Sequence, residues 1–269
     1  MHDSPLIQLT SAPMSQTLKI EQEGDVAILT LNRPEKANAL NDGIVVGLAR
    51  ALQSPPPGAK AIVLAAAGKH FSAGLDLVEV AKLSLQENIA HSRRWHAAFE
   101  ALEFGSLPVV AVMHGAVVGG GLELAAAAHV RVAEASAYYA LPEGQRGIFV
   151  GGGGSVRLPR LIGASRTMEM MLTGRIYDAE EGHALGLSHY VVGEGEGLAK
   201  GIELAHRIAA NSALSNYAVM HALPRIAECA PSSGYMFEAL MAAATQGDSE
   251  AVQRKDAFLN KRGPKIVRE

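Results

Sequence analysis

The first apolar segments of the chain predict a β-hairpin followed by a helix. Thr17–Glu23 and Val26–Asn32 alternate or run apolar on either side of Gly24-Asp25, a pattern typical of two strands joined by a tight turn. Asn41 then stands where a helix N-cap is expected, because apolar residues follow it at helical spacing. These residues are Ile44, Val45, Leu48, Ala49 and Leu52.

Strands and helices alternate over the next hundred residues. Leu77–Phe104 predicts one long helix with charges on one face, and Gly115–Gly121 predicts a loop leading into a helix over Leu122–Ala128. This alternation predicts an α/β fold with a mostly parallel sheet covered by helices. The strands expected here are Lys60–Ala66, Pro108–His114, Val130–Ala133 and Ala137–Ala140.

From Ala164 onward the pattern is nearly all helical. We therefore expect three parts: a flexible N-terminal lead over residues 1–16, an α/β core over residues 17–200 and a helical C-terminal region over residues 201–269. The expected helices are Ala164–Leu172, Asp178–Leu185, Glu196–Asn211, Leu214–Ile226 and Ser233–Phe258.

Composition narrows the class of protein. The formal net charge is -3, and 48% of the 269 residues are hydrophobic, so the balance favours a large buried core and does not call for a nucleic-acid partner. No apolar stretch reaches the about 18 residues that span a bilayer, and residues 1–15 lack the pattern of a secretory signal. The single cysteine, Cys229, allows no intrachain disulfide, which fits a cytoplasmic protein.

Several kinds of reactive site are not indicated. The sequence contains no dinucleotide-binding glycine fingerprint after a strand, no Walker loop, no Gly-x-Ser-x-Gly elbow and no His-Glu-x-x-His. Cys229 has no evident catalytic partner. We therefore expect neither a metal site nor a covalent nucleophile.

Two glycine-containing loops each follow a predicted strand. They are His70–Asp76 and Gly115–Glu123, and ligands bind at the carboxyl ends of strands in α/β sheets. Glycines allow close approach of a ligand to backbone N–H groups, and the second loop opens a helix whose first N–H groups are free. Two such donors would stabilise a thioester oxygen that gains negative charge. The alternative is that these glycines only form tight turns or allow close packing.

Two carboxylates are candidates for acid–base chemistry. Glu123 falls in the first turn of an apolar helix, where an acid is also a routine partner of the helix dipole. Glu143 lies between Pro142 and Gly144, where it is alternatively a solvated loop charge. If both side chains face one water, one polarises it while the other transfers a proton. Spacing alone does not bring them together.

These motifs, in this order, resemble the crotonase superfamily, which comprises enoyl-CoA hydratases and isomerases. The resemblance runs from about Thr17 to the C-terminus. It rests on Leu31–Leu40, His70–Leu77, Gly115–Glu123, Pro142-Glu143, Leu172–Gly174 and Ala179–Leu187. It implies a spiral of ββα units with a helical C-terminal region that forms trimers, and an assembly that is a homotrimer or a homohexamer. One departure is His114, where an asparagine is common.

The resemblance also implies roles for individual residues. Leu75 and Gly120 are expected to supply the oxyanion-hole N–H groups, and Glu123 and Glu143 match the two glutamates of the hydratases. No cofactor is expected, because coenzyme A is part of the substrate. The coenzyme is expected to lie along the following residues: Lys36, Ala37, Ala39, Leu40, Ala73, Asp76, Leu77, Phe258 and Lys261. The last two belong to a basic tail that is alternatively only solvated.

The presence of both glutamates favours syn hydration of a short or functionalised 2-enoyl-CoA, with a methylthioacryloyl-CoA or an aromatic enoyl-CoA among the candidates. The segment around Trp95 and Gly147–Gly154 is expected to shape the acyl pocket, with Gly151–Gly154 leaving space. A Δ3,Δ2-enoyl-CoA isomerase is the alternative enzyme. A CoA-binding or RNA-binding scaffold without catalysis is the alternative of another class, although the sequence has no basic stripe for RNA.

Overall fold

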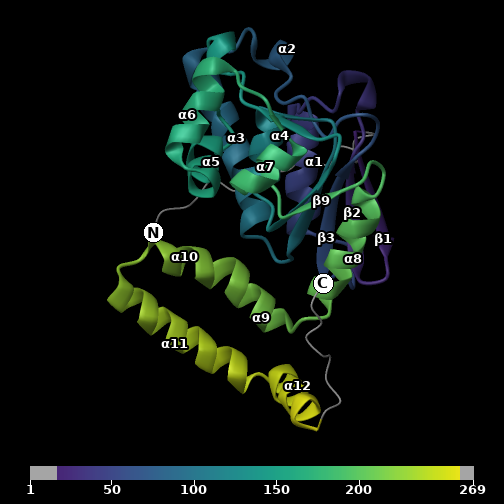
Figure 1. Cartoon of the computed structure of the whole chain (residues 1–269), viewed down its shortest axis with the longest axis vertical. Helices are drawn as coiled ribbons and strands as arrows, with labels where there is room; N and C mark the ends of the chain where they lie inside the picture. Colours follow the sequence, from purple (N-terminus) through teal and green to yellow (C-terminus); the bar gives the residue numbers. More distant parts are fainter. Residues whose placement is uncertain (1–16, 261–269) are drawn as a thin grey trace.

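A six-stranded sheet forms the centre of the computed structural model, which describes residues 17–260 (Figure 1). β1 pairs with β2 in antiparallel orientation, and the remaining neighbours are parallel, as the sequence pattern predicted. In spatial order the strands are β1 (Leu18–Glu23), β2 (Val26–Leu31), β3 (Ala61–Ala66), β4 (Val109–Met113), β6 (Val130–Glu134) and β9 (Tyr190–Val192). The strand β9 was not expected.

A second, three-stranded sheet includes part of the second glycine loop. It consists of β5 (Ala116–Val118), β7 (Tyr138–Ala140) and β8 (Tyr177–Asp178). The prediction of a loop over Gly115–Gly121 was therefore wrong in part. Val117 pairs with Tyr139 and bridges to Ser72, so the segment becomes a strand through partners that are distant in sequence.

Helices cover both faces of the main sheet. On one face, α1 (Asp42–Gln53) begins at the predicted N-cap, since the side chain of Asn41 accepts a hydrogen bond from the N–H of Ile44. On the other face, α8 (Gly197–Ala209) packs Leu204 and Ala205 against the buried valines of the sheet. Because α8 spans residue 200, the boundary expected there lies inside a helix that covers the core.

The predicted helix Leu77–Phe104 is two helices, α2 (Leu77–Val80) and α3 (Leu85–Glu103). The break occurs because Ser84 starts a new helix. Its hydroxyl accepts from the N–H of Glu87 at 3.3 Å, while its own N–H donates to the Glu87 carboxylate at 2.7 Å. The prediction of one continuous helix was wrong because it followed the apolar spacing and overlooked this capping box.

Four further helices and two short 3-10 turns complete the α/β core. The helix α5 was not predicted, because its sequence begins with the end of a glycine run. These elements are α4 (Gly120–Ala126), α5 (Gly154–Ile162), α6 (Ala164–Thr173), α7 (Ala179–Leu185), η1 (Pro34–Lys36) and η2 (Gly144–Arg146).

The C-terminal helices form an arm beside the α/β core (Figure 1). They are α9 (Ala213–Tyr217), a π-helical turn (Ala218–Ala222), α10 (Leu223–Glu228), α11 (Pro231–Gly247) and α12 (Ser249–Leu259). Ser233–Phe258 is therefore not one helix, since Asp248 adopts an extended backbone and caps α12 through its carboxylate. Leu214–Ile226 is likewise interrupted by the π turn.

Candidate active site

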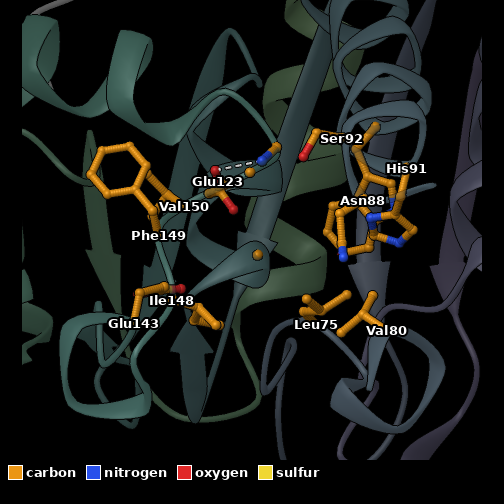
Figure 2. Close-up of a pocket in the computed structure, with 14 residues that line it drawn as sticks. Leu75, Val80, Asn88, His91, Ser92, Glu123, Glu143, Ile148, Phe149 and Val150 are labelled. Carbon is orange, nitrogen blue, oxygen red and sulfur yellow. Dashed lines mark hydrogen bonds between the residues drawn. The ribbon is translucent and has the colours of Figure 1, made fainter. Parts of the chain in front are cut away.

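A cavity of about 250 Å³ brings together the four residues predicted to carry the chemistry (Figure 2). It lies between α2 and α3 on one side and the segment 143–152 on the other, above the start of α4. Its lining residues are Leu75, Val80, Asn88, His91, Ser92, Trp95, Gly120, Glu123, Glu143, Ile148, Phe149, Val150, Gly151 and Gly152. The cavity thus includes Trp95 and part of the glycine run, as expected.

Glu123 is held in this cavity by backbone groups. Its side chain is only 3% exposed, and Oε1 accepts hydrogen bonds from the N–H of Gly152 at 2.8 Å and of Gly154 at 2.7 Å. Burial raises the pKa of the Glu123 carboxyl, while these N–H donors oppose the rise. The outcome is a fixed carboxyl group that holds its proton more tightly than an exposed glutamate.

Glu143 precedes η2 and is also buried, with 6% exposure. Burial, together with the nearby charge of Glu123, raises the pKa of Glu143 to about 7. Within residues 17–260 its Oε2 has no hydrogen-bond partner. Gly119 leaves the space for this carboxylate, because a Cβ at Gly119 would lie 2.5 Å from Oε1. Glu143 is therefore a titratable group whose pKa lies near neutral pH.

The N–H groups of Leu75 and Gly120 come from two loops in direct contact. A Cβ on Gly120 would lie 3.3 Å from the N of Leu75, and a Cβ on Gly74 would lie 2.7 Å from the carbonyl oxygen of Val118. Gly74 also has φ +93°, a backbone conformation that residues with a side chain rarely adopt. Glycine is therefore needed at position 74 both for this conformation and to avoid a clash with Val118. Neither N–H donates a hydrogen bond within the described part of the chain, so both are free to bind an oxygen.

The segment expected to carry coenzyme A is joined to the first loop by backbone hydrogen bonds. Ala73 donates to the carbonyl of Ala37 at 2.9 Å, Leu40 donates to that of Gly74 at 2.7 Å, and Asp76 donates to that of Leu40 at 2.9 Å. These bonds join two segments that lie more than thirty residues apart in the sequence, and of the two segments only Leu75 lines the cavity. The two segments also contain Lys36, Ala39 and Leu77.

A side-chain ion pair reinforces this junction. Arg33 lies 2.7 Å from the carboxylate of Asp76, and this hydrogen bond lowers the pKa of Asp76. Asp76 also caps α2 through the N–H of Val78. Its charge is therefore already compensated within the chain, which makes Asp76 a support of the loop.

The C-terminal residues proposed for coenzyme A are not near this cavity in the single chain. Phe258 lies exposed on α12, at the opposite end of the molecule from α2 (Figure 1), and does not line the cavity. Lys261 lies outside the described residues. Contact of this segment with coenzyme A stays a prediction.

Several contributors were missed by the reasoning from sequence. The N–H groups of Gly152 and Gly154 hold Glu123, so the glycine run does more than leave space. Asn88, His91 and Ser92 line the cavity from α3. Their spacing of three and four residues places them on one helix face, which was the available signal. In the described ranges, no cluster of histidine, cysteine and acidic residues suited to a metal is present.

Comparison with known sequences places this arrangement in a family. The model of the enoyl-CoA hydratase/isomerase family matches residues 21–267. The chain belongs to the enoyl-CoA hydratase/isomerase family. It is 34% identical to a Mycobacterium bovis protein provisionally named an enoyl-CoA hydratase, over 94% of this chain and 98% of the relative. It is 29% identical to the short-chain-enoyl-CoA hydratase of Clostridium acetobutylicum, over 90% and 94% of the two chains. These relatives confirm the expectation of an enzyme.

Solved structures confirm the expected crotonase fold. A Rhodopseudomonas palustris protein provisionally described as an enoyl-CoA hydratase aligns with a TM-score of 0.89 and 52% identity, covering 91% of this chain and 95% of that chain. The enoyl-CoA hydratase of Bacillus anthracis aligns with a TM-score of 0.86 and 29% identity, covering 93% and 99%. In the part of this chain that the structure describes, we find no helix with the length and apolar character needed to span a bilayer.

Proposed function

We propose that the protein hydrates short or functionalised 2-enoyl-CoA thioesters to 3-hydroxyacyl-CoA products. The observation that carries this proposal is the presence of Glu123 and Glu143 in one cavity with the free N–H groups of Leu75 and Gly120. Hydration needs a group that activates water, a group that transfers a proton and donors for the developing oxyanion. All three requirements are met by residues of this cavity.

The proposed reaction begins with binding of the thioester oxygen by the two N–H groups. They withdraw electron density from the double bond and stabilise the enolate that forms when water attacks C3. The two glutamates share that water, and one accepts its proton while the other supports delivery of a proton to C2. Both transfers occur from one side of the substrate, which gives syn addition. Because two nearby carboxyl groups titrate as a pair, the separate acid and base roles belong to the pair.

The test is incubation of the purified protein with crotonyl-CoA. Hydration removes the conjugated double bond, so the enoyl-thioester absorbance is expected to fall and the product mass to increase by one water. A panel of short, long, aromatic and methylthio-substituted enoyl-CoA thioesters then defines the substrate range. Conversion of a 3-enoyl-CoA to a 2-enoyl-CoA with no hydration of any panel member would instead identify an isomerase.

The scaffold alternative is distinguished by the same assay. A protein that only binds coenzyme A would convert no thioester, so neither wild type nor a glutamate-to-glutamine variant would show turnover of any panel member. The relatives with hydratase names and the raised pKa values of both carboxyls support the enzyme.

We also infer that the protein assembles as a homotrimer or a homohexamer. The helix α11 supports this, because apolar side chains are exposed along it in the single chain. Monomeric proteins rarely expose contiguous large apolar surfaces. The exposed residues are Tyr235, Met236, Phe237 and Leu240.

A further inference from the structure

Three side chains of α3 form what we call the polar wall of the cavity: Asn88, His91 and Ser92. The spacing of three and four residues places them on one face of the helix. The proposed hydration chemistry uses none of them. Figure 2 shows the polar wall on the side of the cavity that faces Glu123.

Each member of the polar wall has hydrogen-bonding capacity that the protein leaves unused. Asn88 donates through Nδ2 to the carbonyls of Leu83 and Ser84 at 3.0 Å each, and its Oδ1 is left as an acceptor. The hydroxyl of Ser92 makes no hydrogen bond within residues 17–260.

His91 is the most buried member, and its Nε2 has no hydrogen-bond partner in the described structure. This same Nε2 lies 3.5 Å from Oδ1 of Asp42, the first residue of α1. Burial lowers the pKa of His91, although Asp42 opposes this, so the ring is neutral at neutral pH and offers one donor and one acceptor.

The opposite side of the cavity is apolar. Ile148, Phe149 and Val150 lie across from the polar wall in Figure 2. The two sides meet where Ser92 contacts Gly151, since a Cβ on Gly151 would lie 3.0 Å from the serine hydroxyl. An acyl group in this cavity therefore meets hydrocarbon on one side and hydrogen-bonding groups on the other.

The charges in the cavity favour a neutral group. No lysine or arginine is among its lining residues in the described chain, and Glu123 and Glu143 both add negative charge when ionised. A carboxylate on the acyl chain would be repelled and would lack a cationic partner. A hydroxyl group both donates and accepts, so it matches the acceptor of Asn88 and the hydroxyl of Ser92.

We propose that the polar wall selects 2-enoyl-CoA substrates whose acyl group carries a neutral hydrogen-bonding substituent, in the simplest case a hydroxyl, beyond the double bond. This inference rests on the proposed hydratase function and specifies its substrate class. Asn88, His91 and Ser92 are thereby specificity-determining residues, and the reaction that supplies the substrate must yield a hydroxylated acyl chain.

The test compares substrates of matched size. We measure kcat/KM for 4-hydroxybut-2-enoyl-CoA against pent-2-enoyl-CoA, and for 5-hydroxypent-2-enoyl-CoA against hex-2-enoyl-CoA. In at least one pair, the protein is expected to favour the hydroxylated substrate about 10-fold or more, because a pocket that hydrogen-bonds a substrate discriminates against the analogue that lacks the group. The charged 4-carboxybut-2-enoyl-CoA is expected to be poor.

Variants separate recognition from the intrinsic reactivity of each substrate. Ser92→Ala and Asn88→Ala are expected to reduce the hydroxyl preference about 5-fold or more, with little change for pent-2-enoyl-CoA. Arg93→Ala, on an exposed position of the same helix, is the matched control and is expected to keep the preference. The intrinsic reactivity of each substrate is the same whichever variant is assayed. A change in the ratio of kcat/KM between the hydroxylated substrate and its unsubstituted partner therefore reports on the polar wall.

The two proposals fail in different ways. If crotonyl-CoA is hydrated but the substrate ratios are the same in wild type, Ser92→Ala and Asn88→Ala, the polar wall does not select the substrate. A clear preference for 4-carboxybut-2-enoyl-CoA would also overturn the inference that the polar wall selects neutral substituents. If no enoyl-CoA of any kind is hydrated, the proposed function itself is wrong. Retained crotonyl-CoA turnover in each variant shows that it has folded.

Discussion

The N–H of Gly154 donates a 2.7 Å hydrogen bond to Oε1 of Glu123, and a Cβ added to Gly154 would lie only 2.7 Å from Cγ of the same glutamate. Glycine at position 154 therefore fixes the carboxyl group and leaves room for its side chain. The glycine run that leads into α5 is therefore part of the support for Glu123. The need to fit this side chain explains why position 154 is a glycine.

Replacement of Gly154 by alanine is expected to displace Glu123. The backbone N–H remains, but the new methyl group overlaps the glutamate side chain, and misplacement of a catalytic group by about 1 Å costs on the order of 100-fold in rate. We expect kcat with crotonyl-CoA to fall 10-fold or more. Gly247→Ala is the control, since a Cβ there meets nothing within 4 Å. Equal activity of the two variants would contradict the role of Gly154.

Replacement of either glutamate by glutamine tests the paired mechanism. Glu123→Gln and Glu143→Gln keep the size of the side chain but remove its ability to exchange a proton. We expect kcat to fall by about 10²–10⁴-fold in each variant, the range typical of general acid–base catalysis. Steady-state kinetics, with circular dichroism to confirm folding, provides the measurement. Unchanged turnover in both variants would show that the pair is not catalytic.

The raised pKa of Glu143 predicts a stability cost that appears as pH rises. The folded protein holds this proton up to about pH 7, while the unfolded chain releases it near the ordinary value of 4.5. Stability from this group is thus intact below pH 4.5 and declines as pH rises to about 7. The loss is at most about 3–4 kcal/mol, since the pKa rises from 4.5 to about 7 and each pKa unit corresponds to about 1.4 kcal/mol.

Glu143→Gln removes this cost, because a neutral amide does not ionise. We expect the variant to have a higher Tm than the wild type at pH 8, and this difference to shrink as the pH approaches 5. Thermal unfolding measured across this range is the test. A Tm difference independent of pH would mean that Glu143 titrates normally in the folded state.

Gly120→Ala is expected to obstruct the proposed oxyanion hole. Its Cβ would lie 2.9 Å from Cζ3 of Trp95 and 3.3 Å from the N of Leu75, which is the region where the thioester oxygen is expected to bind. Loss of one oxyanion donor costs about 10²–10³-fold in kcat, and we expect a reduction of at least 10²-fold. Gly47→Ala in α1 is the control, because its Cβ makes only an ordinary 3.6 Å contact with Leu18. Similar kinetics for both variants would exclude this site for the oxygen.

Charged residues on α11 are expected to disrupt the proposed trimeric or hexameric assembly. Met236 and Leu240 are exposed in the single chain and lie one helical turn apart. We expect the double variant Met236→Asp, Leu240→Asp to have a lower mass by size-exclusion chromatography with light scattering than the wild type. Glu238→Gln on the same helix is the control. A wild-type protein that is already monomeric would refute the proposed oligomer.

Local chemistry made part of the fold predictable. The hairpin, the buried strands and the N-cap at Asn41 follow from patterns confined to a few neighbouring residues. The errors in helix length also have local causes, whereas β5 forms through partners distant in sequence. The capping box at Ser84 and the extended backbone at Asp248 each interrupt an apolar pattern that continues across them, so helical spacing alone overestimates the length of a helix.

The sequence by itself determined which residues are capable of acid–base chemistry and which glycines open the two loops. Tertiary structure decided that Glu123 and Glu143 share one cavity, that backbone N–H groups of the glycine run hold Glu123, and that α3 contributes a polar wall. The physical reason is burial. A raised pKa, an unpaired histidine nitrogen or a free N–H group acquires its chemical meaning only when distant segments pack around it and exclude water.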